Sequence, residues 1–209
     1  MLNADFHIHT HYSKCSNMKP LDIVRTAVSR GYDVIGVVDH NSIRGGLEVK
    51  KIAGRKLLVI PGEEIMTEDG EVIVFLSDGK YNRNLVEICE RAKSMNHYVV
   101  FPHPFDYLRL SVLGNINKIK NIDAIEVFNS RVFLDSFNKM AEEYAQKRGI
   151  PKVAASDSHF LEEIGNVKCS LDCERSIDSV FECIKKGNIR FSVKKSGIMM
   201  HVRSTARIL

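Results

Sequence analysis

The sequence predicts an α/β fold in which about seven mainly parallel strands form a closed or nearly closed barrel. Short apolar runs alternate along the chain with amphipathic segments, which is typical of successive strand–helix units. Histidine and carboxylate side chains recur where the apolar runs end, and barrel enzymes carry their chemistry at the carboxyl ends of their strands. An open, doubly wound sheet is the alternative, because it also arises from alternating strands and helices.

The strands are predicted from apolar, often β-branched runs that are bounded by turn residues. In chain order they are expected at residues 2–9, 33–38, 56–60, 71–76, 98–101, 124–128, 152–155 and 190–193. A Glu-Asp-Gly turn at 68–70 precedes the fourth strand, and prolines follow the third and fifth. Strands of this length and number are sufficient for one barrel.

The helices are predicted from apolar residues spaced three and four positions apart. They are expected at residues 20–31, about 46–53, 83–95, 134–148 and 176–187, with loop and short helix at 105–121. Pro20 suits the start of a helix, and Gly31 and Gly149 suit helix ends. Because helices separate most of the strands, the sheet is expected to be mainly parallel.

Length and composition indicate one soluble globular domain over residues 1–209. The chain has 44% hydrophobic and 27% charged residues and contains no apolar run of the roughly 18 residues that a membrane span needs. Its beginning lacks the features of a signal peptide, so we expect a cytoplasmic protein. Five scattered cysteines do not suggest a disulfide framework. The net charge of +4 suits an anionic substrate, although it does not by itself indicate nucleic-acid binding.

Side chains that can bind metal end several of the predicted strands. His7 and His9 alternate at the end of the first run, and Asp157 and His159 alternate after the run at 153–155. Alternate residues of a strand point to the same face, so each pair lies side by side. Further imidazole and carboxylate groups follow other strands, at His40, Glu64 and His103. This pattern predicts a multinuclear metal site and therefore a metal-dependent hydrolase.

Six short segments together resemble the PHP (polymerase and histidinol phosphatase) family. HIHTHYS, VDHN, PGEEI, FPHPFD, IEVFN and ASDSH occur in the order seen in that family, and the resemblance extends from about residue 3 to about residue 195. The resemblance implies a distorted, TIM-barrel-like fold of seven mainly parallel strands. It also implies two or three divalent metal ions, such as zinc, manganese or iron, and hydrolysis of phosphoesters.

The same resemblance implies a set of ligands. His7, His9, Glu64 and Asp157 resemble the ligands of a first metal, with Glu64 bridging to a second; His103 resembles a ligand of the second, and His40 and His159 resemble ligands of a third. Two positions depart from the family pattern. Cys15 stands about where an aspartate or histidine commonly completes the third site, and Glu71 stands where many members have a histidine of the second. Both are candidate ligands; a loop cysteine and a surface glutamate are the alternatives.

Other residues at the same strand ends are candidates for supporting roles. Asp39 is expected to hold His40 or another ligand by a hydrogen bond, and Glu126 and Asn129 are expected behind the ligands in the same way. Arg44 and Arg131 follow strand ends and are candidates for binding phosphate. The candidates for moving protons are Asp157, His159 and His40.

The reaction expected from this pattern is metal-assisted hydrolysis of a small phosphomonoester, such as a nucleotide. A 5′–3′ exonuclease or oligonucleotide-trimming enzyme on the same site is an alternative. One wall of a basic, aromatic-lined groove would then be formed by Phe105, Tyr107, Arg109, Lys118 and Lys120. An amidohydrolase and a non-catalytic nucleic-acid-binding protein, as in an RNase P relative of the family, are further alternatives. The joint presence of the metal-ligating residues favours catalysis, with a small phosphorylated substrate or a short oligonucleotide as partner and no membrane.

Overall fold

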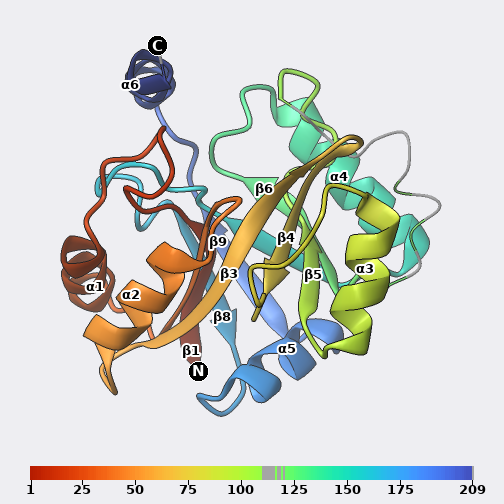
Figure 1. Ribbon diagram of the computed structural model, residues 1–209, viewed down its shortest axis with the longest axis horizontal. Helices are drawn as coiled ribbons and strands as arrows, with labels where there is room; N and C mark the ends of the chain where they lie inside the picture. The colour runs from red at the N-terminus through yellow and green to blue at the C-terminus, as the bar shows by residue number, and fades with distance from the viewer. Residues whose placement is uncertain (110–115, 117–118, 120, 209) are drawn as a thin grey trace.

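The computed structural model describes residues 1–109, 116, 119 and 121–208. In this part of the chain one sheet has the strand order β7-β6-β5-β4-β3-β2-β1-β8-β9 (Figure 1). The strands are β1 (Leu2–Ile8), β2 (Val34–His40), β3 (Leu58–Thr67), β4 (Gly70–Phe75), β5 (Tyr98–Phe101), β6 (Ala124–Asn129), β7 (Lys152–Ala155), β8 (Val167–Leu171) and β9 (Ile189–Val193). The helices are α1 (Pro20–Ser29), α2 (Arg44–Ala53), α3 (Leu85–Ser94), α4 (Asp135–Arg148), α5 (Ile177–Lys185) and α6 (Ile198–Ile208).

The sheet curls into a nearly closed barrel. Strands β1, β2 and β3 are parallel to one another, as are β5, β6 and β7, while β4 is antiparallel to both of its neighbours. Just beyond β7, the Ser158 amide donates to the carbonyl oxygen of His7 (3.1 Å), and the His9 amide donates to Ser158 (2.9 Å). This contact joins the end of β7 to β1, so the predicted barrel is confirmed and the open sheet is wrong.

Strand β3 is longer than predicted and forms a hairpin with β4. The sequence placed its end at Ile60, but pairing with β4 extends it to Thr67. Pro61 lies inside this strand, and its carbonyl oxygen accepts from the Leu76 amide (2.8 Å). Gly62 is required by close packing, since a Cβ there would lie 2.7 Å from the carbonyl oxygen of Val74. The extension carries Glu63 and Glu64 on a strand rather than on a loop.

Two elements were not predicted. Strand β8 pairs antiparallel with β1, and its alternating buried and half-buried residues gave too short a pattern to recognise. Helix α6 follows β9 and stands away from the barrel in Figure 1. Among the helices of the described ranges, none combines the length and apolar character needed to cross a bilayer.

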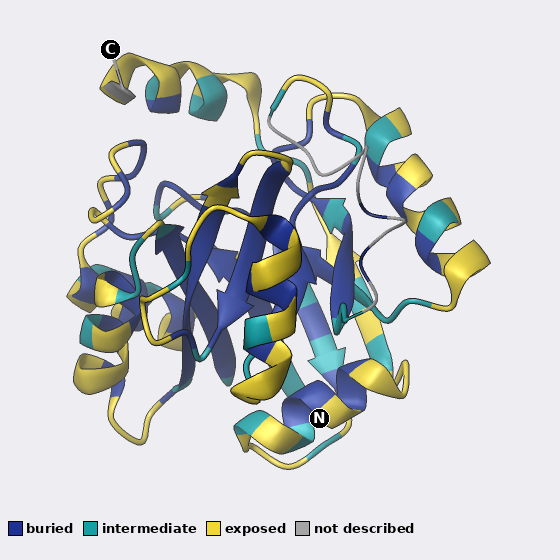
Figure 2. Ribbon diagram, turned by 45° about the vertical axis from the view of Figure 1, so that its right-hand side comes forward, coloured by how far each residue is buried: buried dark blue, intermediate teal, exposed yellow. Residues whose placement is uncertain are grey.

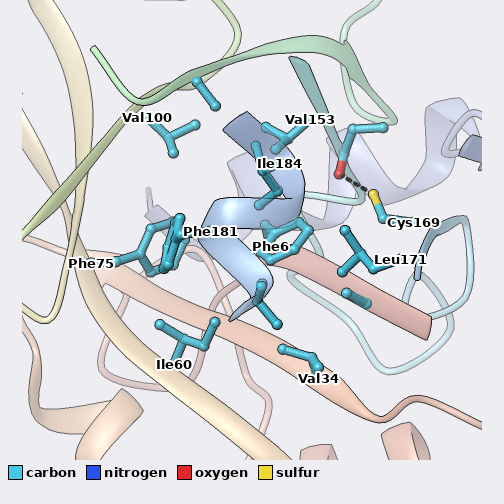
Figure 3. Packing of buried hydrophobic residues seen from close by; sticks show 14 of the residues in the cluster. Phe6, Val34, Ile60, Phe75, Val100, Val153, Cys169, Leu171, Phe181 and Ile184 are labelled. Carbon is cyan, nitrogen blue, oxygen red and sulfur yellow. Dashed lines mark hydrogen bonds between the residues drawn. The ribbon is translucent and has the colours of Figure 1, made fainter. Parts of the chain in front are cut away.

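The core closes the end of the barrel where the parallel strands begin. Phe181 of α5 stacks on Tyr98 with ring centroids 3.6 Å apart and lies 5.7 Å from Phe75. Figure 3 shows Phe181 and Ile184 among side chains from the surrounding strands. Figure 2 shows buried strands at the centre and exposed residues on the outer faces of the helices. Because α5 fills this end with apolar side chains, polar groups gather at the opposite end.

Candidate metal centre

The predicted ligands converge at the carboxyl ends of the parallel strands. His7 and His40 lie on β1 and β2, and Glu64 lies on β3. The reversed direction of β4, which was not predicted, brings Glu71, near its start, to the same edge. The remaining ligands follow strand ends: His9 after β1, His103 after β5, and Asp157 and His159 after β7. All of them are buried except His40, whose side chain is 32% exposed.

Four of these side chains have the spacing of ligands around one ion. His7 Nε2 lies 3.0 Å from His9 Nε2, and each of these nitrogens lies 3.5 Å from Glu64 Oε2. Asp157 Oδ1 lies 3.5 Å from the His7 nitrogen and 3.2 Å from the His9 nitrogen. Ligand atoms about 2.1 Å from a tetrahedral ion lie about 3.4 Å from one another. His7, His9 and Glu64 therefore form a group that could hold a metal ion, and Asp157 lies beside its two histidines.

Glu64 connects this group to a second set of side chains. Its Oε1 lies 3.3 Å from His103 Nε2, and its Oε2 lies 3.0 Å from His40 Nδ1. Glu71 Oε2 is 3.6 Å from the His103 nitrogen, and Glu71 Oε1 is 3.7 Å from the His40 nitrogen. His9, His40 and His159 form another group whose ligand atoms lie within 4.8 Å of one another. Glu64 thus lies between the two sets of side chains, and its bridging role remains a prediction.

The chemistry of the donor atoms also fits a cation. Glu64 Oε2 and His40 Nδ1 are close, but they lack hydrogen-bond geometry, and within the described residues neither has a hydrogen-bond partner. Buried polar atoms without a partner are costly in a folded protein. Coordination of a cation would satisfy both atoms, so the residues present fit the metals that the family pattern implies.

The carboxylates and imidazoles strongly shift the pKa of one another. Burial disfavours the charged form of His7, but Asp157, Glu64 and Glu126 together raise the pKa of its imidazole well above the ordinary value. Burial alone would raise the pKa of Glu64, yet His7 and His40 hold it well below the usual range. Burial and the neighbouring Glu64 raise the pKa of Glu71 to about 6. The buried carboxylate of Glu64 is thus stabilised in its charged form by nearby positive charge.

Glu126 and Asn129 support His7 from behind, as predicted. Glu126 Oε1 lies 2.7 Å from His7 Nδ1, which leaves Nε2 directed at the other ligands. The Asn129 side-chain amide donates to the other oxygen of Glu126 (2.8 Å). A carboxylate behind an imidazole fixes its ring orientation and tautomer. Both residues therefore hold a ligand without belonging to the three groups of ligand atoms.

We expect Glu126→Ala to weaken metal binding and hydrolysis by about 10–100-fold, because the His7 ring loses the acceptor that orients it. Glu126→Gln keeps an acceptor oxygen and should lose less. Competition with a chromophoric chelator would measure the metal affinity of each variant. Equal losses in the alanine and glutamine variants would contradict an orienting role.

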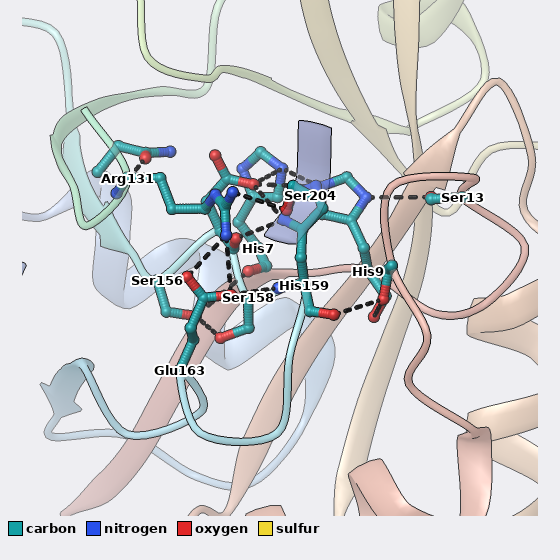
Figure 4. Close-up of polar contacts among 12 residues, drawn as sticks. His7, His9, Ser13, Arg131, Ser156, Ser158, His159, Glu163 and Ser204 are labelled. Carbon is teal, nitrogen blue, oxygen red and sulfur yellow. Dashed lines mark hydrogen bonds and ion pairs between the residues drawn. The ribbon is translucent and has the colours of Figure 1, made fainter. Parts of the chain in front are cut away.

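Asp39 organises the loop after β1 rather than the ring of His40. Its Oδ1 accepts hydrogen bonds from the Thr10 amide and the Ser13 hydroxyl, each at 2.7 Å. The Ser13 oxygen lies 3.2 Å from His9 Nδ1, as Figure 4 shows, and accepts from the His40 amide at 3.0 Å. Asp39 therefore reaches a ligand through Ser13, in keeping with the expectation that it holds His40 or another ligand.

Replacing Gly45 by alanine should disturb this loop, because a Cβ at Gly45 would overlap the Asp39 carboxylate and the Thr10 hydroxyl. We expect a loss of about 1–3 kcal/mol in the free energy of unfolding, the usual result of overpacking. Urea denaturation would measure it. Gly197→Ala is the matched control, since a Cβ there meets nothing within 4 Å. A Gly45→Ala protein as stable as this control would show that the loop can move aside.

Two of the predicted ligands have unusual backbone conformations. His103 has φ 47° and Asp157 has φ 54°, a region that residues other than glycine seldom adopt. Such conformations persist only where the surrounding structure enforces them, and they cluster at functional sites. Here they turn the side chains at the ends of β5 and β7 toward the other ligands.

The remaining predicted residues lie at the edge of the ligand groups. Arg44 is exposed and lies over the ring of Tyr12, with its guanidinium carbon 5.5 Å from the ring centroid. Arg131 is buried and donates to both oxygens of Glu163 (2.7 and 2.9 Å) and to the Ser204 hydroxyl (2.8 Å), as drawn in Figure 4. Cys15 is buried beside His40 but lies outside the three groups. The roles predicted for these three residues remain predictions.

A cavity of about 880 Å³ opens over the ligands. Its lining includes His40, Glu64, Glu71, His103, Asp157 and His159. Arg109, which was expected in one wall of an oligonucleotide groove, also lines the cavity. His201 of α6 lines it as well, although it lies in no recognisable motif. Lys118 and Lys120, which were expected beside an oligonucleotide groove, lie outside the described residues.

Comparisons with known proteins find matches over most of the chain. A family model described as the PHP domain matches residues 5–146, and one described as PHP-associated matches residues 135–189. An uncharacterised protein of Methanocaldococcus jannaschii is 32% identical over 173 residues, which cover 79% of this chain and 68% of that protein.

Solved structures show the same fold. A two-domain protein of Bacteroides vulgatus that contains a predicted PHP-like metal-dependent phosphoesterase aligns with a TM-score of 0.77 at 17% identity, covering 99% of this chain and 69% of that one. Endonuclease Q, in complex with a duplex that carries an abasic lesion, aligns with a TM-score of 0.68 at 19% identity, covering 90% of this chain and 58% of that one. The matched family model covers most of the chain, and the chain therefore belongs to the PHP domain family.

Proposed function

We propose that this protein hydrolyses small phosphomonoesters, such as nucleotides, at the metal centre described above. The observation that carries the proposal is the placement of Glu64, whose two oxygens lie between the His7–His9 pair and His103 at the floor of the cavity. Bound divalent cations would activate water and stabilise the charge of the phosphoryl group. A cavity of about 880 Å³ lies within the range typical of small-molecule sites.

The residues around the ligands have distinct tasks. His7, His9, Glu64 and Asp157 would hold one cation, and His103, Glu71, His40 and His159 would hold up to two more. His159 Nδ1 lies 2.8 Å from the carbonyl oxygen of Asp157, an acceptor that requires a proton on that nitrogen. The neutral ring therefore keeps Nε2 unprotonated, able to bind a cation or to accept a proton. Asp157 and His40 are the other candidates for moving protons.

An oligonucleotide-trimming activity is the second candidate, because apolar side chains are exposed around the cavity. Phe133 lines it and is 50% exposed, and Tyr107, beside the lining residue Leu108, is 55% exposed. Aromatic rings of this kind provide surfaces on which successive bases stack. A strand's terminal phosphate would then lie at the same ligands.

The test compares a panel of substrates with zinc, manganese or iron supplied. We expect turnover of an aryl phosphate and of mononucleotides, and loss of that turnover on chelation. Preferential turnover of short oligonucleotides would favour the trimming enzyme instead. Absence of turnover on every phosphoester with every metal would contradict both, and would favour a non-catalytic nucleic-acid-binding protein or an amidohydrolase.

A further inference from the structure

Arg109 projects from the chain after β5 into the cavity, beside the predicted metal ligands. Its NH1 group donates to Asp157 Oδ2 at 2.6 Å, and its NH2 group donates to Asn129 Oδ1 at 3.2 Å. Its Nε donates to Asp106 Oδ2 at 3.0 Å. A guanidinium has five N–H groups, so these bonds leave two that have no protein acceptor within the described part of the chain. The side chain is 28% exposed, which leaves it accessible from the cavity.

The three acceptors hold the guanidinium in one orientation. The other oxygen of Asp106 accepts from the Leu108 amide at 3.1 Å, and the side-chain amide of Asn129 is held by Glu126 at 2.8 Å. The two oxygens of Asp157 have different partners: Oδ2 accepts from Arg109, and Oδ1 faces His7 and His9. A guanidinium group whose orientation is fixed before the ligand binds loses little conformational entropy on binding.

The other cationic side chains of the cavity are less suited to an anion. Arg131 is 6% exposed, and its guanidinium is occupied by both oxygens of Glu163 and by Ser204. Lys14 is exposed and supplies a point charge without a fixed geometry. Arg109 alone of these three combines unused N–H groups with a direct contact to a predicted ligand.

We propose that Arg109 is the residue that recognises the phosphoryl group of the substrate. Its two remaining N–H groups would donate to phosphoryl oxygens, and bidentate contacts of this kind are what makes arginine selective for phosphate. The same side chain keeps Asp157 Oδ1 facing His7 and His9. This inference rests on the proposed function, and it assigns phosphate recognition to Arg109 rather than to Arg44 or Arg131, the candidates from the sequence.

The test uses the full-length, metal-loaded protein, with Arg109→Gln and Arg109→Lys as variants. Arg25→Gln is the matched control, because Arg25 is exposed on α1 and lies outside the cavity lining. Isothermal titration with inorganic phosphate would give Kd, and aryl phosphate hydrolysis would give KM and kcat. We expect Arg109→Gln to raise both Kd and KM at least about tenfold, the effect of losing charge-assisted hydrogen bonds. Arg109→Lys should lie between it and the wild type, and Arg25→Gln should match the wild type.

Measuring the metal content of each variant distinguishes two roles of Arg109, recognition of phosphate and positioning of Asp157. Variants that retain the metal content of the wild type but bind phosphate weakly would support the inference. Reduced metal content with an unchanged phosphate Kd in the metal-loaded fraction would overturn it, because Arg109 would then act only on Asp157. If the wild type binds phosphate through Arg109 but hydrolyses nothing, the inference stands and the proposed function fails. A wild type that binds no phosphate would overturn the inference.

Discussion

Glu64→Gln should reduce metal binding and abolish hydrolysis. Glu64 is 1% exposed, and its two oxygens lie 3.0–3.5 Å from ring nitrogens of His7, His9, His40 and His103. An amide removes the negative charge that faces the cations and offers one oxygen in place of two. Residues that only orient ligands typically contribute about 10–100-fold to activity, and we expect the loss here to be well beyond that. Elemental analysis and the rate of aryl phosphate hydrolysis would measure the two effects.

The neighbouring carboxylate provides the matched control. Glu63 precedes Glu64 on β3 and is also buried, but its side chain is hydrogen-bonded to the Ser77 hydroxyl and does not line the cavity. Glu63→Gln keeps an oxygen that can accept from Ser77, so metal content and turnover should remain near those of the wild type. Equal losses in the two variants would indicate damage to β3 rather than removal of a ligand.

Arg131→Met should strongly destabilise the folded protein. The ion pair with Glu163 is buried, with side chains 6% and 1% exposed and a shortest distance of 2.7 Å. Removal of the guanidinium leaves the Glu163 carboxylate buried without its counter-charge, which typically costs about 3–5 kcal/mol. For a chain of this length, we expect the Tm to fall by roughly 6–20 °C. Differential scanning calorimetry would measure the change.

A double variant distinguishes the effect of the unpaired Glu163 charge on stability from the effect of lost packing at Arg131. Glu163 also accepts from the backbone amides of His159 and Phe160 at 2.9 and 3.1 Å, and a glutamine side-chain oxygen can still accept from them. Arg131→Met with Glu163→Gln should therefore recover part of the stability lost by Arg131→Met alone. A double variant less stable than the single one would show that the loss came from packing of the arginine.

The predicted fold was correct where local pattern determines structure. The parallel barrel strands are largely apolar runs with polar side chains at their ends or just beyond, and both properties are visible in the sequence, as at Val34–His40. The direction of β4 was not predicted, because the third strand was ended at Ile60, which left room for a crossover connection. In the structure only residues 68 and 69 separate β3 from β4, and so short a connection permits only an antiparallel pair.

The candidate ligands could be predicted because they belong to strand ends, whereas the position of Arg109 beside Asp157 could not. Its contact with Asp157 joins residues 48 positions apart, and it depends on the path of the chain after β5. Helix α6 was not predicted, and its residues Ile198, Met199 and Val202 are exposed in the structure. Its contribution to the cavity comes from polar residues, such as His201 and Ser204.

The location of bound metal tests the central claim most directly. Crystals of the full-length protein grown with manganese would be measured for anomalous scattering. We expect one peak bounded by His7, His9, Glu64 and Asp157, and at least one more beside His103 or His40, each about 2.0–2.3 Å from its ligand atoms. Peaks confined to other parts of the molecule, or a cluster without any peak at saturating manganese, would contradict the assignment of this site.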